Sequence, residues 1–254
     1  MIITARDNKI FKLANALKDR RKREEHRAFL IEGMRSVKDA AAKGAEIKFI
    51  IKKDGFVLNE EFGCPVYTFA PKLFNELSDT VTPQGIIGVC AMKINSLSDL
   101  TGDCIVMCEA VQDPGNIGTV IRTAHASFCG GVVLSKGCCD LYNPKTVRAT
   151  MTGIFSVPVS CNVESEEIIA HFKGRGYKIV AGALKVNSVS LYEASLKGKV
   201  LIIIGNEGSG VSEKTLSLCD EIVKIPMRDD AESLNVGIAG GILMYEHYRQ
   251  NFAF

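Results

Sequence analysis

The chain of 254 residues is long enough for one large domain or two smaller ones, each with its own hydrophobic core. Hydrophobic residues make up 46% of it and charged residues 24%, a balance typical of globular proteins that argues against disordered, collagen-like and coiled-coil classes. No apolar run reaches the roughly 18 residues that would span a bilayer, and the N-terminal residues lack the apolar core of a secretory signal. We therefore expect a cytoplasmic protein with no membrane partner.

Nine cysteines could suggest a disulfide scaffold. Their number is odd, however, most lie inside apolar runs, and no two have CxxC spacing, while the four histidines are scattered along the chain. We therefore predict free, mostly buried thiols in a reducing compartment, and no metal site.

The charge is unevenly distributed. Residues 1–53 contain 15 Lys and Arg against 7 Asp and Glu, a net charge of +8, whereas the remaining 201 residues contain 16 against 22, a net charge of −6. A basic segment on an otherwise acidic protein indicates a polyanionic partner such as a nucleic acid. Cations at the end of a helix also suit the helix macrodipole, so a solvated helix end is the alternative for the densest cluster. That cluster, predicted to close the first helix, is Arg20, Arg21, Lys22 and Arg23.

Helix and strand signals alternate through the first part of the chain. Apolar residues at helical spacing predict three helices, over 10–17, over 37–43 and from residue 71 onward. Asp7 is the expected N-cap of the first helix. Strands are predicted at 29–31, 47–51, 66–69 and 86–92. Residues 1–94 are therefore expected to form a small α/β domain, with a linker at 95–103.

The alternation continues more regularly beyond the linker. Five largely apolar runs predict strands at 105–109, 131–134, 178–184, 200–204 and 222–225. Such runs are typical of a parallel sheet with helices on both faces. Asn143 and Ser165 are expected to cap helices, and a long helix is predicted over 234–249. The fold class is therefore α/β, with a second, larger domain over 104–254.

Parallel sheets bind ligands at the carboxyl ends of their strands, and three such ends are unusual here. The first strand of the second domain is followed by a loop-to-helix junction that contains Asn116 and Gly118, with Arg122 about one and a half turns into the helix. An arginine on this otherwise apolar face either pairs with an acidic side chain or is directed at an anion.

A glycine-rich loop, residues 205–210, follows the strand at 200–204. Its order matches neither the dinucleotide fingerprint G-x-G-x-x-G nor a P-loop, and Glu207 would repel a phosphate. A ligand without phosphate, or with positive charge, suits this loop better. An ordinary turn that uses glycine for positive φ is the alternative.

At the third strand end, Ile225-Pro226-Met227 leads through a polar loop to Ser233-Leu234-Asn235-Val236 at the start of the last helix. Small residues on that helix permit the close approach of a ligand or of another backbone, and ordinary packing on the sheet is the alternative. They are Gly237, Ala239, Gly240 and Gly241.

Together, these three segments resemble the motifs of the SpoU/TrmH family of RNA ribose 2′-O-methyltransferases, within the SPOUT superfamily. Residues 116–122 are similar to the family's N-x-G-x-x-x-R, residues 205–210 to its G-x-E-G-x-G, and residues 225–236 to its I-P-M followed by S-L-N-V. The motifs occur in the family's order and near its usual spacing, which makes the joint match specific.

The resemblance extends to nearly the whole chain. Residues 143–155 are similar to the family's K-x-V-R-A-x-M-G-x-x-F stretch, and the basic N-terminal domain resembles a substrate-binding domain of a type shared with a large-subunit ribosomal protein. The sequence departs from the family pattern at Thr152, Asp229 and Gly237, which puts local loop shape in question but touches none of the residues expected to carry the chemistry.

The resemblance implies a fold that spacing alone does not predict. SPOUT sheets are tied in a deep trefoil knot in their C-terminal part, an exception to the rule against threaded chains. The family binds S-adenosylmethionine within the knot and works as a homodimer through its knotted domain, so the glycine-lined last helix would form part of the interface. Carried over by position, the donor-binding residues would be Leu184, Gly205, Asn206, Ile225, Met227 and Leu234.

The family assigns activation of the ribose 2′-hydroxyl to the arginine of its first motif, here Arg122. Because a guanidinium normally keeps its proton in water, stabilising the emerging alkoxide or holding the adjoining phosphate is the alternative to acting as a base. No metal is required. The residues that would orient Arg122 and the substrate are Asn116, Glu207, Ser233 and Asn235.

The implied substrate is ribosomal RNA, because the N-terminal domain looks more like the ribosomal RNA branch of the family than the transfer RNA branch. A transfer RNA 2′-O-methyltransferase, a base methylator and a non-catalytic RNA-binding protein are alternatives. A nicotinamide-dependent oxidoreductase would require a dinucleotide fingerprint and a ribose-binding acid about twenty residues beyond it, and the sequence has neither.

Overall fold

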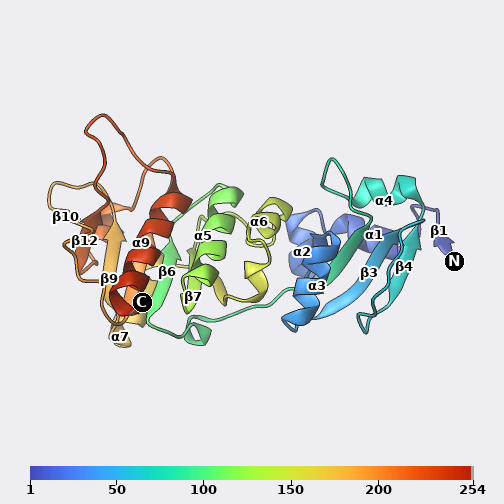
Figure 1. The fold of residues 1–254 in the computed structure, drawn as a ribbon, viewed down its shortest axis with the longest axis horizontal. Helices are drawn as coiled ribbons and strands as arrows, with labels where there is room; N and C mark the ends of the chain where they lie inside the picture. Colours follow the sequence, from blue (N-terminus) through green and yellow to red (C-terminus); the bar gives the residue numbers. More distant parts are fainter. Residues whose placement is uncertain (253–254) are drawn as a thin grey trace. The chain divides into compact units, whose positions relative to one another are not determined.

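The computed structural model describes residues 1–252, which form two compact units. The first unit contains residues 1–93 and 142–155, and the second contains residues 94–141 together with the chain from 156 onward. Each unit is built on its own sheet (Figure 1).

The first unit has a five-stranded mixed sheet in the order β1-β4-β3-β5-β2. β5 runs antiparallel to β2 and β3, whereas β4 runs parallel to β3 and β1. The four predicted strands are all present, and β1 was not foreseen because it is only two residues long. The strands are β1 (Ile2–Ile3), β2 (Ala28–Glu32), β3 (Ile47–Lys53), β4 (Val66–Phe69) and β5 (Ile86–Ala91).

Four helices from the first part of the chain accompany this sheet, and the two over 9–16 and 71–77 pack their apolar faces on it around Phe11, Phe69 and Phe74. Asn8, not the predicted Asp7, caps the first helix, because its Oδ1 accepts a hydrogen bond from the backbone N of Ile10 (2.8 Å). The helices are α1 (Lys9–Ala16), α2 (Arg20–His26), α3 (Met34–Ala42) and α4 (Pro71–Leu77).

The basic cluster does not close the first helix, as the sequence predicted, but begins a separate helix, α2. The side chain of Asp19 accepts a hydrogen bond from the backbone N of Lys22 (3.1 Å), which is the N-cap geometry of a new helix. The chain therefore turns between α1 and α2, at Leu17–Asp19, instead of continuing as one helix.

Residues 142–155 belong to the first unit although the sequence predicted them inside the second domain. They form α6 (Pro144–Ala149), with Asn143 as its cap as expected, and a short 3₁₀ turn, η2 (Gly153–Phe155). The Tyr142 hydroxyl donates to the carbonyl oxygen of Lys93 (2.7 Å), and the rings of Tyr142 and Phe155 lie 4.5 and 6.1 Å from that of Phe29. These aromatic contacts hold the segment against β2.

The second unit has an all-parallel seven-stranded sheet in the order β10-β12-β9-β11-β6-β7-β8. The five predicted strands are all present, with ends shifted by at most two residues; β8 and β10 were not foreseen, because they are partly exposed at the sheet edges. The strands are β6 (Cys104–Cys108), β7 (Gly131–Ser135), β8 (Val159–Val163), β9 (Lys178–Gly182), β10 (Val189–Ser190), β11 (Val200–Ile204) and β12 (Glu221–Lys224).

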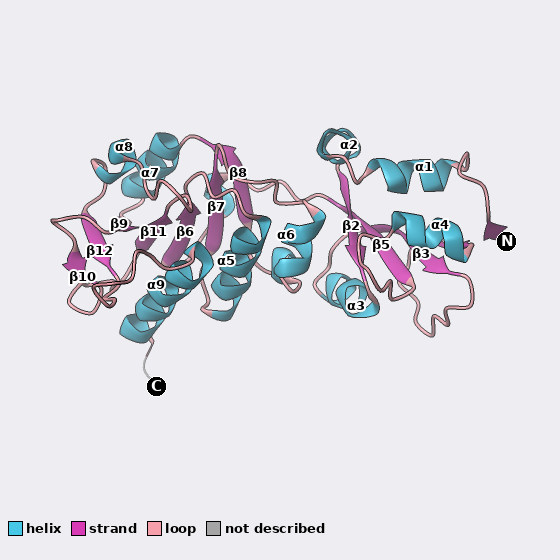
Figure 2. Ribbon diagram, turned by 90° about the horizontal axis from the view of Figure 1, so that it is seen from above, coloured by secondary structure: helices cyan, strands magenta, loops and turns pink. Residues whose placement is uncertain are grey.

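Helices cover both faces of this sheet, as the continuous apolar runs predicted. α5 (Pro114–Ala126) and α9 (Val236–Asn251) lie on one face, and α7 (Ser165–Gly174) and α8 (Glu213–Leu216) on the other (Figure 2). Glu164 occupies the cap position of α7, one residue before the predicted Ser165. The expected linker is partly ordered, because η1 (Leu97–Asp99) has a capping box and Asn95 bridges to β8.

Two glycines of the last helix let α9 pack closely on α5 and on β11. A Cβ at Gly237 would lie 2.9 Å from Cγ2 of Thr119, and one at Gly240 would lie 3.1 Å from Cδ1 of Ile204, so any side chain at Gly237 would push the helices apart. For Gly237 and Gly240, close packing within the chain is therefore the correct interpretation. A Cβ at Gly241 would make only an ordinary contact, 3.6 Å from Cγ2 of Thr123, and Ala239 lines a cavity described below. No helix among residues 1–252 is long and apolar enough to cross a membrane.

Candidate active site

A cavity of about 520 Å³ lies in the second unit, where β9, β11 and β12 end and α9 begins. The sequence predicted that ligands bind at this edge, and the structure brings the predicted residues together although they come from segments up to 50 positions apart. The cavity is lined by all six predicted donor-binding residues and by Glu207 and Ser233 of the predicted catalytic set. The six are Leu184, Gly205, Asn206, Ile225, Met227 and Leu234.

The glycine-rich loop closes on itself in a narrow turn. The backbones of Asn206 and Gly210 exchange two hydrogen bonds of 3.0 Å. A Cβ at Gly205 would lie 2.1 to 2.3 Å from backbone atoms of Gly210 and Val211, so no other residue fits this position without moving the loop. Gly210 has a φ of +68°, which glycine adopts at little cost. The loop needs glycine at two of its three glycine positions for these two separate reasons.

The side chain of Asn206 holds the loop rather than pointing freely into the cavity. Its Oδ1 accepts hydrogen bonds from the backbone N of Gly208 (2.9 Å) and Ser209 (3.1 Å), and its Nδ2 donates to the carbonyl oxygen of Ala110 (2.9 Å). Asn206 therefore fixes the loop to the end of β6 and shapes the cavity wall.

Three of the predicted catalytic residues form one hydrogen-bonded chain. Nδ2 of Asn235 donates to Oδ1 of Asn116 (2.8 Å), and Nδ2 of Asn116 donates to Oε1 of Glu207 (2.9 Å). Glu207 also accepts hydrogen bonds from the backbone N of Gln112 (3.2 Å) and Asp113 (3.0 Å). One residue from each sequence motif is therefore held in a fixed order, with the largely buried Asn116 in the middle.

This chain sets the charge state of Glu207. Partial burial by itself raises the pKa of the carboxyl, but the hydrogen bonds from Asn116 and from the backbone of Asp113 and Gln112 together outweigh it, so the pKa of Glu207 is lowered. Glu207 is therefore ionised at neutral pH and acts as an acceptor that orients Asn116.

Arg122 stands apart from this chain. It is exposed on α5, and within residues 1–252 it makes no hydrogen bond or ion pair, so the alternative of a satisfied ion-pair partner is wrong. Arg122 does not line the 520 Å³ cavity either. Of the five predicted catalytic residues, Asn116, Glu207 and Asn235 are joined by hydrogen bonds, and Ser233 lines the cavity. Arg122 is joined neither to those residues nor to the cavity. A free guanidinium on an exposed helix face remains available for an anion.

Comparison with known proteins identifies these segments. Residues 103–245 match the SpoU rRNA Methylase family model, which covers more than half of the chain and all three motifs. The chain belongs to the SpoU rRNA methylase family. Residues 8–88 also match a second model, the MRM3-like substrate binding domain, so this family member has an N-terminal substrate-binding domain within its first unit.

Similar proteins cover almost the full length of this SpoU methylase. The chain is 35% identical over 232 residues to the 23S rRNA (guanosine(2553)-2′-O)-methyltransferase RlmP of Bacillus subtilis, with 90% of this chain and 92% of that protein covered. The AdoMet-bound rRNA methyltransferase from Sinorhizobium meliloti superposes with a TM-score of 0.88 at 29% identity, covering 98% and 97% of the two chains. AviRb of Streptomyces viridochromogenes in complex with AdoMet gives a TM-score of 0.86 at 28% identity, covering 96% and 98%.

The cavity of this SpoU methylase fits S-adenosylmethionine. Its volume of about 520 Å³ lies within the usual range for ligand sites, roughly 300–1,000 Å³. The apolar side chain of Leu184 is 52% exposed at its wall, where a flat adenine could cover it. Glu207 and Glu232 line the cavity with carboxylates, which suit a sulfonium cation, and Lys185 and Lys224 line it with ammonium groups, which suit a carboxylate.

Sequence reasoning missed one buried carboxylate next to this cavity. Glu109, at the end of β6, is 8% exposed and accepts hydrogen bonds from the backbone N and Oγ of Ser212 (both 2.9 Å) and from Oγ1 of Thr215 (2.5 Å). It thereby fixes the start of α8, directly after the glycine-rich loop. The signal was an acidic residue at the end of a buried apolar run, which was interpreted only as the end of the strand.

The four predicted RNA-binding cations do not share one environment. Arg23 is 3% exposed, and its Nη1 donates to the carbonyl oxygens of Leu17 (2.9 Å) and Lys18 (2.7 Å), so the prediction that it contacts RNA directly is wrong. Arg20 and Lys22 are exposed and form ion pairs with Glu24 (2.9 Å) and Glu25 (2.7 Å) on the same helix, and Arg21 is exposed. Such surface pairs are weak and exchange readily for phosphate.

The cysteines and histidines form no metal centre in the described part of the chain. No group of three or more His, Cys, Asp or Glu side chains among residues 1–252 could hold a metal ion. All nine cysteines have free thiols, but only four of them are buried, so the prediction of mostly buried thiols is wrong.

Proposed function

We propose that this protein transfers a methyl group from S-adenosylmethionine to a ribose 2′-hydroxyl of ribosomal RNA. The observation that carries the proposal is the hydrogen-bonded chain Asn235–Asn116–Glu207 beside a cavity that all six predicted donor-binding residues line. Relatives that match nearly the full length of the chain are named as 23S rRNA 2′-O-methyltransferases, which supports ribosomal RNA over transfer RNA.

When bound, S-adenosylmethionine supplies an electrophilic methyl group on a sulfonium. Displacement at that methyl requires in-line placement of the 2′-oxygen and, once the hydroxyl proton has passed to water, stabilisation of the negative charge left on that oxygen. The unpaired guanidinium of Arg122 would serve the second need, by stabilising the alkoxide or by holding the adjoining phosphate. Asn116 and Glu207 hold the start of α5, the helix that bears Arg122, against the glycine-rich loop.

We further propose that the C-terminal part of the second unit is knotted. The supporting feature is the return of the chain after β12. β12 lies near one edge of the sheet, yet α9 packs on α5 and over β11, and its start lies at the glycine-rich loop that follows β11. A path from a strand near the edge back to the centre, beside a loop that is already closed, is what a threaded chain requires.

We also propose a homodimer formed through this unit. The resemblance implies that the glycine-lined last helix forms part of the interface, but Gly237 and Gly240 of that helix are buried against α5 and β11 of the same chain. Two exposed apolar side chains on α9, Ile238 (54% exposed) and Tyr245 (48%), are the candidates in their place. Exposed large apolar groups on one helix favour burial against a second copy. The cytoplasmic location also stays a prediction.

The decisive experiment is methyl transfer from S-adenosylmethionine labelled in its methyl group. We expect label in large-subunit ribosomal RNA from a strain that lacks the gene, at a ribose that alkaline hydrolysis leaves uncut, and none in RNA from the parent strain. Label only in transfer RNA would establish the transfer RNA enzyme, and label in a base would establish a base methylator. RNA binding without any transfer would leave a non-catalytic RNA-binding protein.

A further inference from the structure

A second cavity, of about 270 Å³, lies wholly within the first unit and has no part in the site described above. β2, the start of α3, the end of α4 and residues 144–155 surround it. Its volume lies just below the roughly 300–1,000 Å³ typical of ligand sites, so it has room for a small flat group and not for a large ligand.

The walls of this cavity are mostly apolar. Leu30 of β2 and Val147 of α6, both at most 9% exposed, line it together with the half-buried ring of Phe155. Aliphatic and aromatic side chains of this kind stack against unpaired nucleobases in RNA-binding proteins.

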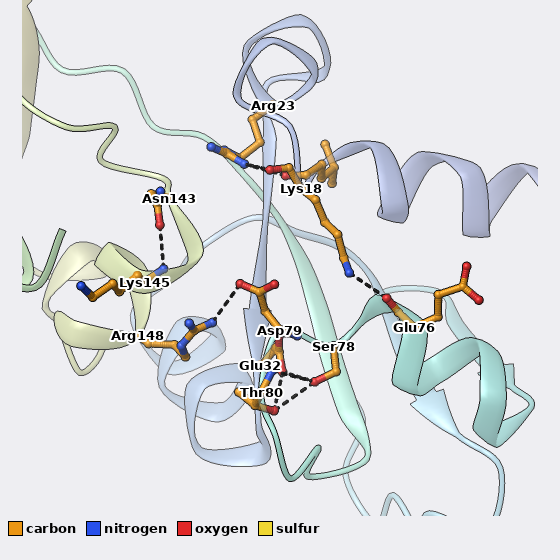
Figure 3. Close-up of polar contacts among 11 residues, drawn as sticks. Lys18, Arg23, Glu32, Glu76, Ser78, Asp79, Thr80, Asn143, Lys145 and Arg148 are labelled. Carbon is orange, nitrogen blue, oxygen red and sulfur yellow. Dashed lines mark hydrogen bonds and ion pairs between the residues drawn. The ribbon is translucent and has the colours of Figure 1, made fainter. Parts of the chain in front are cut away.

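Two carboxylates, those of Glu32 and Asp79, lie at the edge of the cavity. Glu32 accepts hydrogen bonds from Oγ of Ser78 (2.7 Å), from Oγ1 of Thr80 (3.1 Å) and from the backbone N of Asp79 (2.6 Å), which fixes residues 78–80 beside β2 (Figure 3). Ionised carboxylates only accept hydrogen bonds, and each oxygen can accept more than one. Every RNA base has at least one N–H on its base-pairing edge that can donate a hydrogen bond to such an oxygen.

Three cations complete the lining: Lys18, Arg35 and Arg148. Nη1 of Arg148 lies 3.5 Å from Oδ2 of Asp79, and both side chains are more than a third exposed. An exposed pair at this distance contributes little to stability, so Arg148 can exchange Asp79 for a phosphate at almost no cost. The whole first unit has 19 Lys and Arg against 12 Asp and Glu, a net charge of +7, which favours a polyanion.

We propose that this cavity takes up one unpaired nucleotide of the substrate RNA, with the base between Leu30, Val147 and Phe155 and its phosphate on Arg148. The inference rests on the proposed function only for the identity of the RNA as substrate. It assigns to the substrate-binding domain a specific requirement, an unstacked nucleotide, in addition to its general positive charge.

The test compares RNA hairpins of one length, four with a single bulged A, C, G or U and one fully paired, bound to the full-length protein and measured by fluorescence anisotropy. We expect the wild type to bind at least one bulged hairpin about tenfold more tightly than the paired one, which is within the effect of one stacked base. Equal affinity for all five hairpins would overturn the proposal.

Two matched pairs of variants locate the effect. Ser36→Leu fills the cavity from α3, so it should abolish the preference for bulged hairpins and leave the affinity for the paired hairpin unchanged. Ala42→Leu adds the same side chain at an exposed position of α3 that does not line the cavity, so it should keep the preference for bulged hairpins. Arg148→Gln should lower the affinity for the bulged hairpin more than the affinity for the paired one. Lys145→Gln, on the same helix but outside the cavity lining, should lower both affinities equally. Thermal unfolding checks that each variant is folded.

Retention of the preference in Ser36→Leu would reject the cavity as the binding site. The methyl-transfer assay on ribosomal RNA separates this result from the fate of the proposed function. Transfer by a wild type that shows no preference for bulged RNA rejects the nucleotide site alone, and a preference without transfer rejects the proposed activity alone.

Discussion

Nδ2 of Asn235 donates a hydrogen bond to Oδ1 of Asn116 at 2.8 Å, although 119 positions separate the two residues in the chain. The bond fixes the orientation of the Asn116 amide, because its oxygen must then accept and its nitrogen is left to donate to Glu207. Asn235 also caps α9 by accepting from the backbone N of Ile238 (3.2 Å). One side chain thus sets where the last helix begins and how the first motif is arranged.

We expect the two asparagines to be energetically coupled. In a double-mutant cycle, Asn116→Ala and Asn235→Ala should show a coupling of about 0.5–3 kcal/mol in the free energy of unfolding, measured with urea. The matched control pairs Asn235→Ala with Asn143→Ala, which caps α6 in the other unit and should add independently. Additivity of Asn116→Ala and Asn235→Ala would show that their hydrogen bond contributes nothing.

Replacement of Arg122 tests its place in the reaction. Arg122→Ala should lower methyl transfer by about 100-fold or more, the effect of removing one group that stabilises developing charge. Because Arg122 does not line the larger cavity, affinity for S-adenosylmethionine, measured by calorimetry, should stay within about twofold of wild type. His125→Ala, at an exposed position of the same helix, is the control and should leave transfer unchanged. Wild-type turnover in Arg122→Ala would remove the residue from the mechanism.

The glycine-rich loop offers its own matched pair. Gly205→Ala places a methyl group 2.1 Å from a backbone carbon of Gly210, so we expect the loop to open and affinity for S-adenosylmethionine to fall at least tenfold. At Gly208 the nearest atom, Oδ1 of Asn206, would be 3.7 Å from the added methyl, an ordinary contact, so Gly208→Ala should leave the melting temperature of the protein unchanged. Equal melting temperatures and donor affinities for the two variants would show that the loop tolerates side chains at both positions.

The cations of α2 should separate into two classes. Replacing Arg20, Arg21 and Lys22 by Glu should weaken RNA binding and flatten its dependence on salt, because fewer counterions are released. Arg23→Ala should instead lower the free energy of unfolding by about 1–3 kcal/mol, since the backbone carbonyl oxygens of Leu17 and Lys18 lose a buried partner. Filter binding over a range of salt concentrations and urea unfolding distinguish the two. An unchanged salt slope in the triple variant would show that these cations do not meet RNA.

His247 predicts a pH dependence of stability. Burial lowers the pKa of this residue, and the hydrogen bond to the carbonyl oxygen of Gly198 (3.1 Å) opposes burial only in part. The unfolded chain, with a histidine pKa of about 6.5, therefore takes up a proton at a higher pH than the folded protein. Stability should be full above that pH and should decrease as the pH falls below it.

Melting temperatures between pH 7.5 and pH 5.5 test this dependence. His247→Gln, which keeps a donor but cannot titrate, should lose less stability over the interval than the wild type. His125→Gln, at an exposed position, should follow the wild-type curve. The same pH slope in His247→Gln and wild type would show that another group is responsible.

Where the sequence had a strong local signal, it predicted the structure well. The predicted ends of β4 and β11 are the observed ones. For β11 the reason is that a continuous buried run bounded by polar residues leaves little choice of strand ends. The motif segments also gave the residues that line the larger cavity, since the carboxyl ends of neighbouring parallel strands meet at one edge.

The remaining features depend on contacts between distant residues, which local patterns do not contain. Arg23 has the same charge as its neighbours in the sequence. It differs from them because its guanidinium donates hydrogen bonds to the carbonyl oxygens of Leu17 and Lys18, at the turn between α1 and α2. In the sequence, Glu109 is simply a polar residue at the end of a strand. Its hydrogen-bond donors, Ser212 and Thr215, lie more than 100 positions later in the chain. Tyr142 and Phe155 lie in a stretch that adjoins the second sheet in sequence, yet their rings pack on Phe29.

The packing of residues 142–155 on the first unit means that the backbone crosses from one unit to the other three times, near residues 93, 141 and 155. A single protease cut near residue 94 would consequently leave the two fragments associated, because the larger one retains α6 and the aromatic side chains that pair with Phe29. A gene fragment that ends at residue 93 would lack those partners and leave part of β2 uncovered. Any exchange of substrate-binding domains between relatives must for the same reason transplant two stretches of sequence together.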